Sequence, residues 1–364
     1  MEHQHGGKLK QAAAENNLQP EEIIDFSANI NFLGPPEQII NAVRKNAAQI
    51  KNYPEINSKN LKKLIAASHQ LEPEKVTVAN GAAEMLYQLT KVLQPQKVMV
   101  IDPTFSEYQL AAESVGAEIV HFQLQKEAEF FLDLENLKAE LRQEIDLLFI
   151  CNPNNPTGQL IRSADLKAVI EKAAAAGVTI VIDEAFNDFL EKSEKYSAVN
   201  FLEAYDNLVI LKSMTKLFSI PGLRLGYALT NKNLSFKLEN KRDPWSVNYF
   251  SQLAGEIIFG ESEEISEYVK ESRARIARER EFLNSGLKEF KSLKVYQPSV
   301  NYIFIDLSAS SYTAAELKSE LLREAILIRN CDSYYGLQDN YIRVAVKDRK
   351  SNNILLEKLK ALLN

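Results

Sequence analysis

The sequence contains few cysteines and histidines, and their scarcity excludes several kinds of chemistry. Its 364 residues include two cysteines, Cys151 and Cys331, and four histidines. Two thiols this far apart do not form a disulfide scaffold, so we expect a reducing, cytoplasmic setting. We expect no metal site, because no cysteine and histidine cluster has metal-ligand spacing. His69 and His121 are expected to be structural, since neither has the setting of a hydrolytic triad. This scarcity favours chemistry performed by a cofactor.

Long apolar runs and an excess of positive charge are absent as well. No segment approaches the roughly 18 apolar residues that suggest a membrane span. Residues 1–7 contain no apolar region of the kind found in export signals, so we expect no export and no membrane partner. The net charge of −6, with both signs scattered, argues against a nucleic-acid partner. Apolar residues at 45% and charged residues at 25% are typical of a globular protein.

The pattern that is present alternates short apolar runs with helical segments. Six runs read as strands that lie in a parallel sheet buried on both faces, at residues 76–79, 97–101, 118–122, 145–151, 178–182 and 208–211. Helical patterns separate them, as at residues 163–176. This alternation predicts an α/β fold with a large doubly wound, mostly parallel sheet.

The character of the sequence changes after residue 230. Long charged helices are expected within residues 249–290, and two strands at residues 300–306 and 341–346 flank a helix at 313–324. These elements predict a second, smaller α+β domain. We therefore expect three parts, namely an N-terminal arm that contributes to the small domain, a large cofactor-binding domain and a small C-terminal domain, at residues 1–40, 41–240 and 241–364.

Polar, aromatic and small residues follow the predicted strands at their carboxyl ends. In doubly wound sheets, ligands bind outside these ends. The positions with suitable chemistry are Gly81, Phe105, Asn155, Asp183 and Lys216. A carboxylate such as Asp183 at the end of a buried strand needs a partner, because an unpaired buried charge is costly. The convergence of these positions at one sheet edge predicts a cofactor site.

The stretch around Lys216 indicates which cofactor this is. A lysine at a strand end, preceded by Ser213 and Thr215, suits an amine that forms a Schiff base. The two hydroxyls and Arg224 suit a phosphate. On its own the stretch fits an ordinary surface loop equally well. A second candidate phosphate site follows the first strand at Gly81, where a helix begins. An amine beside a phosphate cradle points to pyridoxal phosphate.

Candidate substrate contacts lie in the arm and in the second domain. Asn31 and His5 belong to segments that either tether the arm or cover a pocket. Arg343 lies in an alternating strand and would bind a carboxylate if that strand faces the pocket. Arg329 is a second candidate anion site. Phe105 or Tyr108 could stack on a flat ring, although a core position is commoner for an aromatic residue.

Four motifs, in this order, resemble those of the fold-type I pyridoxal phosphate enzymes of the aspartate aminotransferase superfamily. They are Asn152-Pro-Asn-Asn-Pro-Thr-Gly158, Asp183-Glu-Ala185, Ser213-Met-Thr-Lys216 and Pro221-Gly-Leu-Arg-Leu-Gly226. The order of the motifs is specific, and the resemblance covers essentially the whole chain, including Tyr341-Ile-Arg343. It implies the fold of that superfamily and its cofactor.

The resemblance also implies roles for individual residues. Lys216 would bind the cofactor covalently, Asp183 would pair with the pyridine nitrogen, and Phe105 would stack on the ring. Asn155 would bond the ring hydroxyl O3' and lie near the substrate, whose carboxylate Arg343 would bind. The cofactor phosphate would be held by Gly81, Ala82, Ala83, Ser213, Thr215 and Arg224. The remaining candidates are His5, Gly6, Asn31 and Arg329 for the substrate, and Tyr53, which resembles the tyrosine that reaches into the neighbouring subunit of a homodimer.

Two branches of the superfamily compete for the function. Many relatives have tyrosine at the position of Phe186, and phenylalanine cannot donate a second bond to O3'. This departure resembles the threonine-phosphate decarboxylases, as do residues 5–7, 25–31, 244–248 and 328–331. That branch implies decarboxylation of O-phospho-L-threonine to (R)-1-amino-2-propanol phosphate for the cobalamin nucleotide loop. The alternative is a histidinol-phosphate aminotransferase. A non-catalytic cofactor-binding module would need a DNA-binding segment, which the sequence lacks.

Overall fold

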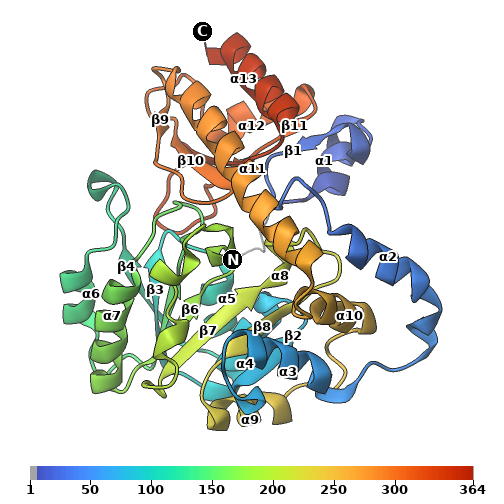
Figure 1. The fold of residues 1–364 in the computed structure, drawn as a ribbon. Helices are drawn as coiled ribbons and strands as arrows, with labels where there is room; N and C mark the ends of the chain where they lie inside the picture. The colour runs from blue at the N-terminus through green and yellow to red at the C-terminus, as the bar shows by residue number, and fades with distance from the viewer. Residues whose placement is uncertain (1–5, 364) are drawn as a thin grey trace.

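A seven-stranded sheet forms the centre of the larger part of the molecule. The computed structural model describes residues 6–363. The strands follow the spatial order β2-β8-β7-β6-β5-β3-β4, in which β8 runs antiparallel to both of its neighbours and the other pairs are parallel (Figure 1). Their bounds are β2 Val76–Ala79, β3 Lys97–Asp102, β4 Glu118–Gln123, β5 Leu147–Cys151, β6 Thr179–Asp183, β7 Leu208–Ser213 and β8 Gly226–Leu229.

Both faces of this sheet are buried, because alternate residues of its central strands point into two separate cores. In β6, Ile180 and Ile182 belong to one core and Val181 to the other. One face is covered by helices α3 (Lys59–Ser68), α6 (Leu134–Glu140), α7 (Ser163–Ala176) and α10 (Tyr249–Ile258). The other face is covered by α4 (Ala82–Leu93), α5 (Glu107–Glu113) and α9 (Lys232–Asn240). This arrangement explains the continuous apolar runs in the sequence.

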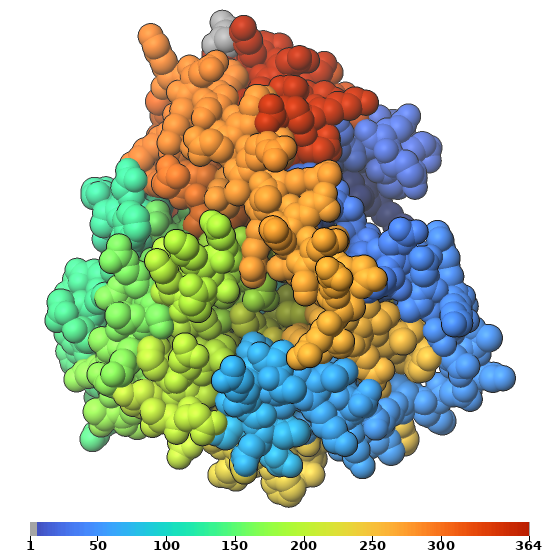
Figure 2. All heavy atoms as spheres, in the orientation of Figure 1, coloured from blue at the N-terminus to red at the C-terminus, as the bar shows by residue number. Residues whose placement is uncertain are grey.

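A second, four-stranded sheet forms the smaller part, in the order β12-β13-β10-β9. Its strands are β9 Lys294–Val295, β10 Tyr302–Asp306, β12 Arg329–Asn330 and β13 Tyr341–Ala345. Its core is shared with helices α11 (Glu263–Lys288), α12 (Ala314–Arg323) and α13 (Arg349–Leu363). Helix α11 runs from beside α10 up to this part, and the space-filling view shows it crossing the front of the molecule (Figures 1 and 2).

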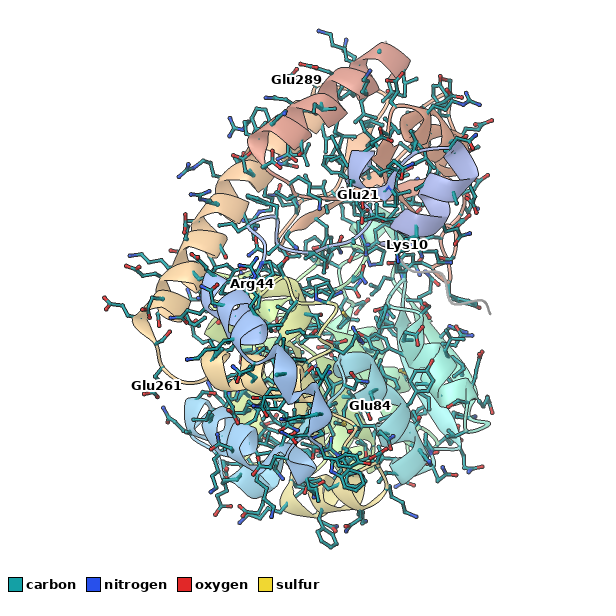
Figure 3. The ribbon with its side chains drawn as sticks, turned by 90° about the vertical axis from the view of Figure 1, so that its right-hand side faces the viewer. Lys10, Glu21, Arg44, Glu84, Glu261 and Glu289 are labelled. Carbon is teal, nitrogen blue, oxygen red and sulfur yellow. The ribbon has the colours of Figure 1, made fainter. Side chains whose placement is uncertain are left out.

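The N-terminal segment joins the smaller part rather than the large sheet. Strand β1 (Ile24–Asp25) pairs in parallel with β11 (Ile326–Leu327), and α1 (Leu9–Asn16) packs near α12. Figure 3 shows Lys10 and Glu21 in the upper part of the molecule with Glu289, whereas Glu84 lies in the lower part. Helix α2 (Glu37–Lys45) then descends to pack against α10. We propose that the domains follow residues 1–40, 41–240 and 241–364, with helix α10 of the third range packed on the large sheet.

The six strands expected in the large sheet all form, with ends shifted by one or two residues. Strand β8 was not expected as a separate element. It has four residues and begins with Gly226, so the sequence there carries little of the pattern of a strand. Glycine is required at this position, because a Cβ would overlap the backbone of Ala82 and Lys212. Among the described residues, no helix has the length and apolar character that crossing a membrane requires.

Candidate active site

A cavity of about 440 Å³ opens at the carboxyl ends of β5, β6 and β7, between the two sheets. The N-terminal segment and the β12–β13 region close it from the other side. Twelve of the residues singled out in the sequence line it together, namely Gly6, Ala82, Ala83, Phe105, Asn155, Asp183, Ser213, Thr215, Lys216, Arg224, Arg329 and Arg343. Of the five strand-end positions expected to converge, Phe105, Asn155, Asp183 and Lys216 line this cavity, whereas Gly81 is not among its lining residues.

Lys216 lies in the short helix α8 (Met214–Leu217), which begins directly after β7. Burial, together with the charges of Arg343 and Arg224, lowers the pKa of its amine from 10.5 to about 8, against the opposing charge of Asp183. A lower pKa leaves more of the amine unprotonated near neutral pH. This is the form that attacks a carbonyl carbon, so the surroundings of Lys216 suit a nucleophile.

Asp183 ends strand β6 and is held in place by two hydrogen bonds. The hydroxyl of Tyr108 donates to Oδ2 at 2.7 Å, and the backbone N–H of Ala185 donates to Oδ1 at 2.9 Å. The pKa of Asp183 lies above its ordinary value, because burial raises it more than these hydrogen bonds and the charges of Lys216 and Lys212 lower it. A buried carboxylate with fixed orientation suits a partner that carries a positive charge on a ring nitrogen.

One end of the cavity has the composition of a phosphate cradle. The hydroxyls of Ser213 and Thr215 lie 2.8 Å apart, and Arg224 lines the wall beside them. Gly81 has φ +81°, and a Cβ there would overlap the Arg224 guanidinium, so only glycine leaves this room. Helix α4 begins at Ala82 and presents its N-terminus to the cavity.

The other end of the cavity contains two arginines on neighbouring strands. Arg329 and Arg343 are register partners in the β12–β13 pair. Arg343 donates to the backbone carbonyl of Ser27 at 2.8 Å, to the hydroxyl of Tyr334 at 3.1 Å and to the Asn155 side-chain oxygen. Tyr334 also donates to that Asn155 oxygen at 3.1 Å. The side-chain carbonyl of Asn155 is thus occupied, and its NH₂ group remains as a donor.

The N-terminal segment crosses this end at close range. Gly6 lines the cavity, and a Cβ at this position would overlap the Ser27 carbonyl, so no larger residue fits. The N–H of Gly7 donates to the Ser27 hydroxyl at 2.8 Å. Asn29 also lines the cavity, is 4% exposed, and has a side-chain oxygen without a hydrogen-bond partner. His5 lies outside the described residues.

Asn31 does not line the cavity, contrary to the expectation of a substrate contact. Its side-chain NH₂ donates to the Leu217 carbonyl and to Ser272, both at 2.8 Å, and to Tyr268 at 3.0 Å. Its backbone N–H donates to the Lys216 carbonyl at 3.1 Å. These bonds fix the arm to the helix that carries Lys216, so we propose that Asn31 positions the chain around the lysine rather than the substrate.

Tyr53 also lies away from the cavity lining. Its side chain is 82% exposed and packs against Trp245, with ring centroids 5.0 Å apart. Such an exposed aromatic pair fits the expected position at a subunit boundary.

Three candidate functional residues were either missed in the sequence or expected in another role. Tyr108 was considered for ring stacking, but it is the hydrogen-bond partner of Asp183. Asn29 stands in the same motif as Asn31 and is the asparagine that reaches the cavity. Tyr334 follows the arginine motif by a few residues and had no signal of its own. Phe186 does line the cavity, in edge contact with Tyr302 at 5.1 Å between centroids.

A second charged cluster lies directly behind the cavity. Lys212 is buried and its Nζ contacts Glu184 at 3.1 Å and Asp188 at 2.9 Å. Glu184 also accepts from the hydroxyl of Ser197 and from the Ala198 N–H at 2.7 Å. None of these three charged residues lines the cavity. The cluster therefore ties β6 and β7 together without reaching a ligand.

The residues fit pyridoxal phosphate: an activated lysine, a carboxylate for a ring nitrogen, an aromatic ring at Phe105 and a glycine-walled phosphate cradle. Within residues 6–363, no group of three or more His, Cys, Asp or Glu side chains is placed to hold a metal. The fold and the site together define a pyridoxal phosphate enzyme of fold type I.

Comparisons with known proteins identify the family. Residues 21–359 match the family described as aminotransferase class I and II, and the chain belongs to it. A threonine-phosphate decarboxylase of Salmonella typhimurium is 31% identical over 363 residues, 99% of this chain and 96% of its own. A histidinol-phosphate aminotransferase of Methanococcus aeolicus is 30% identical over 362 residues, 98% and 95% of the two chains. The crystal structure of a histidinol-phosphate aminotransferase from Clostridium acetobutylicum has a TM-score of 0.85 at 31% identity, covering 92% of this chain and 98% of its own.

Proposed function

We propose that the protein decarboxylates O-phospho-L-threonine to (R)-1-amino-2-propanol phosphate, a precursor of the cobalamin nucleotide loop. The cross-strand pair of Arg329 and Arg343 carries this proposal. Both arginines line the cavity, and guanidinium groups bind carboxylates and phosphates in a bidentate geometry, so the cavity suits a ligand that carries two anionic groups. A substrate with one carboxylate and one phosphate supplies two anions. The similarity to the Salmonella decarboxylase supports the same conclusion.

Different cavity residues bind the two ends of the substrate. Arg343 binds the carboxylate, and its bonds to Ser27 and Tyr334 hold the guanidinium in one orientation. Arg329, whose Nη2 donates to Ser333 at 2.6 Å, binds the phosphate, with Asn29 beside it. Binding both ends of the substrate fixes the rotation about the bond between its nitrogen and its Cα. This rotation selects which bond at Cα breaks.

Pyridoxal phosphate, when bound, withdraws electrons from the Cα of the substrate as the carboxylate leaves. Asp183 keeps a positive charge on the ring nitrogen, because a fixed carboxylate stabilises the protonated form. Ser213, Thr215 and Arg224 anchor the cofactor phosphate. Lys216 would hold the cofactor through its Nζ, and the same Nζ would deliver the proton that Cα takes up when carbon dioxide leaves. The N-terminal segment at Gly6, which passes close to Ser27, would restrict the entry of water.

We further propose that the enzyme works as a homodimer in the cytoplasm. The exposed apolar residues Ile50, Tyr53, Ile56 and Trp245 come from neighbouring segments and would be covered by a second copy. Tyr53 would then reach the cofactor phosphate of the other subunit. Both cysteines are free and buried, which is compatible with a reducing compartment.

Transamination between histidinol phosphate and 2-oxoglutarate is the alternative. The Methanococcus relative, at 30% identity, supports it almost as well as the Salmonella relative supports decarboxylation. The same arginines would bind the two carboxylates of 2-oxoglutarate. The two reactions differ in the bond broken at Cα, so the products separate them.

The test supplies the cofactor-loaded protein with O-phospho-L-threonine and no keto acid, and measures carbon dioxide and the amine product. We expect equimolar carbon dioxide and aminopropanol phosphate. A parallel reaction contains histidinol phosphate and 2-oxoglutarate. Glutamate in that reaction, with no gas in the first, would overturn the proposed decarboxylation and support the aminotransferase.

A further inference from the structure

A ring stack joins the two sheets outside the cavity. The imidazole of His121 and the ring of Tyr335 have centroids 3.5 Å apart and planes inclined by 8°. His121 lies on β4, the edge strand of the large sheet, and Tyr335 lies between β12 and β13 of the small one. Tyr335 is 45% exposed, so the stack is not part of a hydrophobic core.

Neighbouring residues hold both rings of the stack in place. Nδ1 of His121 lies 2.7 Å from Oδ2 of Asp102, which ends β3 and is 4% exposed. Next to Tyr335, Gly336 has φ +79°, and a Cβ there would overlap the side-chain amide of Gln123 on β4. Residues 331–337, which we term the docking loop, therefore meet β4 at two adjacent points, and glycine permits the second.

The docking loop also supplies part of the cavity wall. Ser333 and Tyr334, which directly precede Tyr335, line the cavity. Ser333 accepts from Arg329 at 2.6 Å, and Tyr334 contacts Arg343 at 3.1 Å. The guanidinium of Arg329 lies 5.4 Å from the Tyr334 ring centroid. One short loop thus contacts both arginines on one side and the large sheet on the other.

We propose that the stack of Tyr335 on His121 is a positioning contact that holds the docking loop in the conformation that binds the phosphate end of the substrate. It sets how tightly this end is bound, because it orders Ser333 and Tyr334 before the substrate arrives. It leaves the reacting groups Lys216 and Asp183 untouched. The identity of the substrate rests on the proposed function.

The kinetic test compares Tyr335→Ala with Tyr335→Phe and with a control, Phe236→Ala, which removes an aromatic ring that is 65% exposed on α9. For Tyr335→Ala we expect the KM for O-phospho-L-threonine to rise about tenfold, as for the loss of an aromatic pair, with kcat within about twofold. Tyr335→Phe keeps the ring and should restore the wild-type KM. An unchanged KM in Tyr335→Ala, or no rescue by Tyr335→Phe, would overturn the proposal.

A second measurement needs no substrate. Cys331 begins the docking loop and is buried. In Tyr335→Ala, release of the loop should speed alkylation of Cys331, quantified by mass spectrometry of its peptide, while Tyr335→Phe and Phe236→Ala match wild type. Unchanged labelling would refute the docking role. If wild-type protein releases no carbon dioxide, the proposed function fails, yet this labelling still decides whether the stack holds the loop.

Discussion

Two lysines four residues apart, the buried Lys212 and the partly buried Lys216, lie in opposite electrostatic environments. Burial lowers the pKa of Lys212, but Asp188 and Glu184 outweigh it and hold that pKa above its ordinary value. Burial also lowers the pKa of Lys216, and there the nearby arginines add to the effect, giving about 8. The same residue type is thus a fixed cation on one side of the strand end and a reactive amine on the other.

The difference shows how one strand and the helix after it contribute both to stability and to the proposed chemistry. Lys212 still belongs to β7, and its two carboxylate partners come from the segment after β6. Lys216 lies beyond the strand, in a cavity where a cofactor and a substrate supply the missing anions. A cation that is fully paired within the chain contributes to folding, whereas one left short of partners is available to a ligand.

The largest difference between the roles of the two lysines should appear in the variant Lys216→Ala. We expect turnover to fall by about 1000-fold or more, because both the covalent anchor and the proton donor are lost. The free energy of unfolding should stay within about 1 kcal/mol of wild type, since no fixed ion pair is broken. Steady-state rates and urea denaturation of the same preparation measure the two quantities. Retained turnover would contradict the assignment of Lys216.

Lys212→Met should produce the reverse result. Removing Lys212 leaves the buried Glu184 and the partly buried Asp188 without their shared cation, which costs about 3–5 kcal/mol in unfolding free energy. A matched control is Lys167→Met, which breaks an exposed pair with Glu171 and should cost less than about 1 kcal/mol. Urea denaturation compares the two. Equal stability of the two variants would show that the buried cluster does not stabilise the strand ends.

Arg343→Gln tests the cause of the lowered pKa of Lys216. Removing this neighbouring cation should raise the pKa from about 8 towards 10.5, so less of the amine is neutral at pH 8 and it reacts more slowly there. Asp183→Asn should move the pKa in the opposite direction. The measurement is the pH dependence of Lys216 acylation in cofactor-free protein, followed by mass spectrometry. Shifts of the same sign in both variants would refute the electrostatic explanation.

The smallest effect is expected from Ser197→Ala. The Ser197 hydroxyl lies 3.0 and 2.9 Å from the two oxygens of Glu184. Losing a hydrogen bond to a buried carboxylate should reduce the unfolding free energy by about 1.5 kcal/mol and leave kcat and KM unchanged. Calorimetry and kinetics on the same sample test this. A fall in activity with unaltered stability would place Glu184 in the reaction.

Much of the cavity could be predicted because its residues follow from strand ends. Asp183 and Asn155 stand just after apolar runs, and parallel strands bring such positions to one edge whatever the loop details. Strand β8 was missed, since four residues that begin with a glycine carry too little pattern to read as a strand. The helix–strand alternation therefore identified the sheet but not the strand that reverses in it.

Contacts between distant segments could not be predicted in the same way. Choosing Asn29 over Asn31 depends on which way the arm twists as it passes Lys216, and neither periodicity nor spacing reports this. Tyr108 reaches Asp183 because its ring stacks on Phe149 of β5, which is a matter of packing. The stack of Tyr335 on His121 unites two residues more than 200 positions apart, and sequence reasoning treated His121 as merely structural.

The most direct test of the account is to identify the lysine that holds the cofactor. Borohydride reduction of the pyridoxal phosphate-loaded protein makes the bond permanent, and peptide mass spectrometry then locates it. The account predicts a single phosphopyridoxyl group, on Lys216, with Lys212 unmodified. A label on Lys212 or on any other lysine would contradict the contrast between the two lysines and the site built upon it.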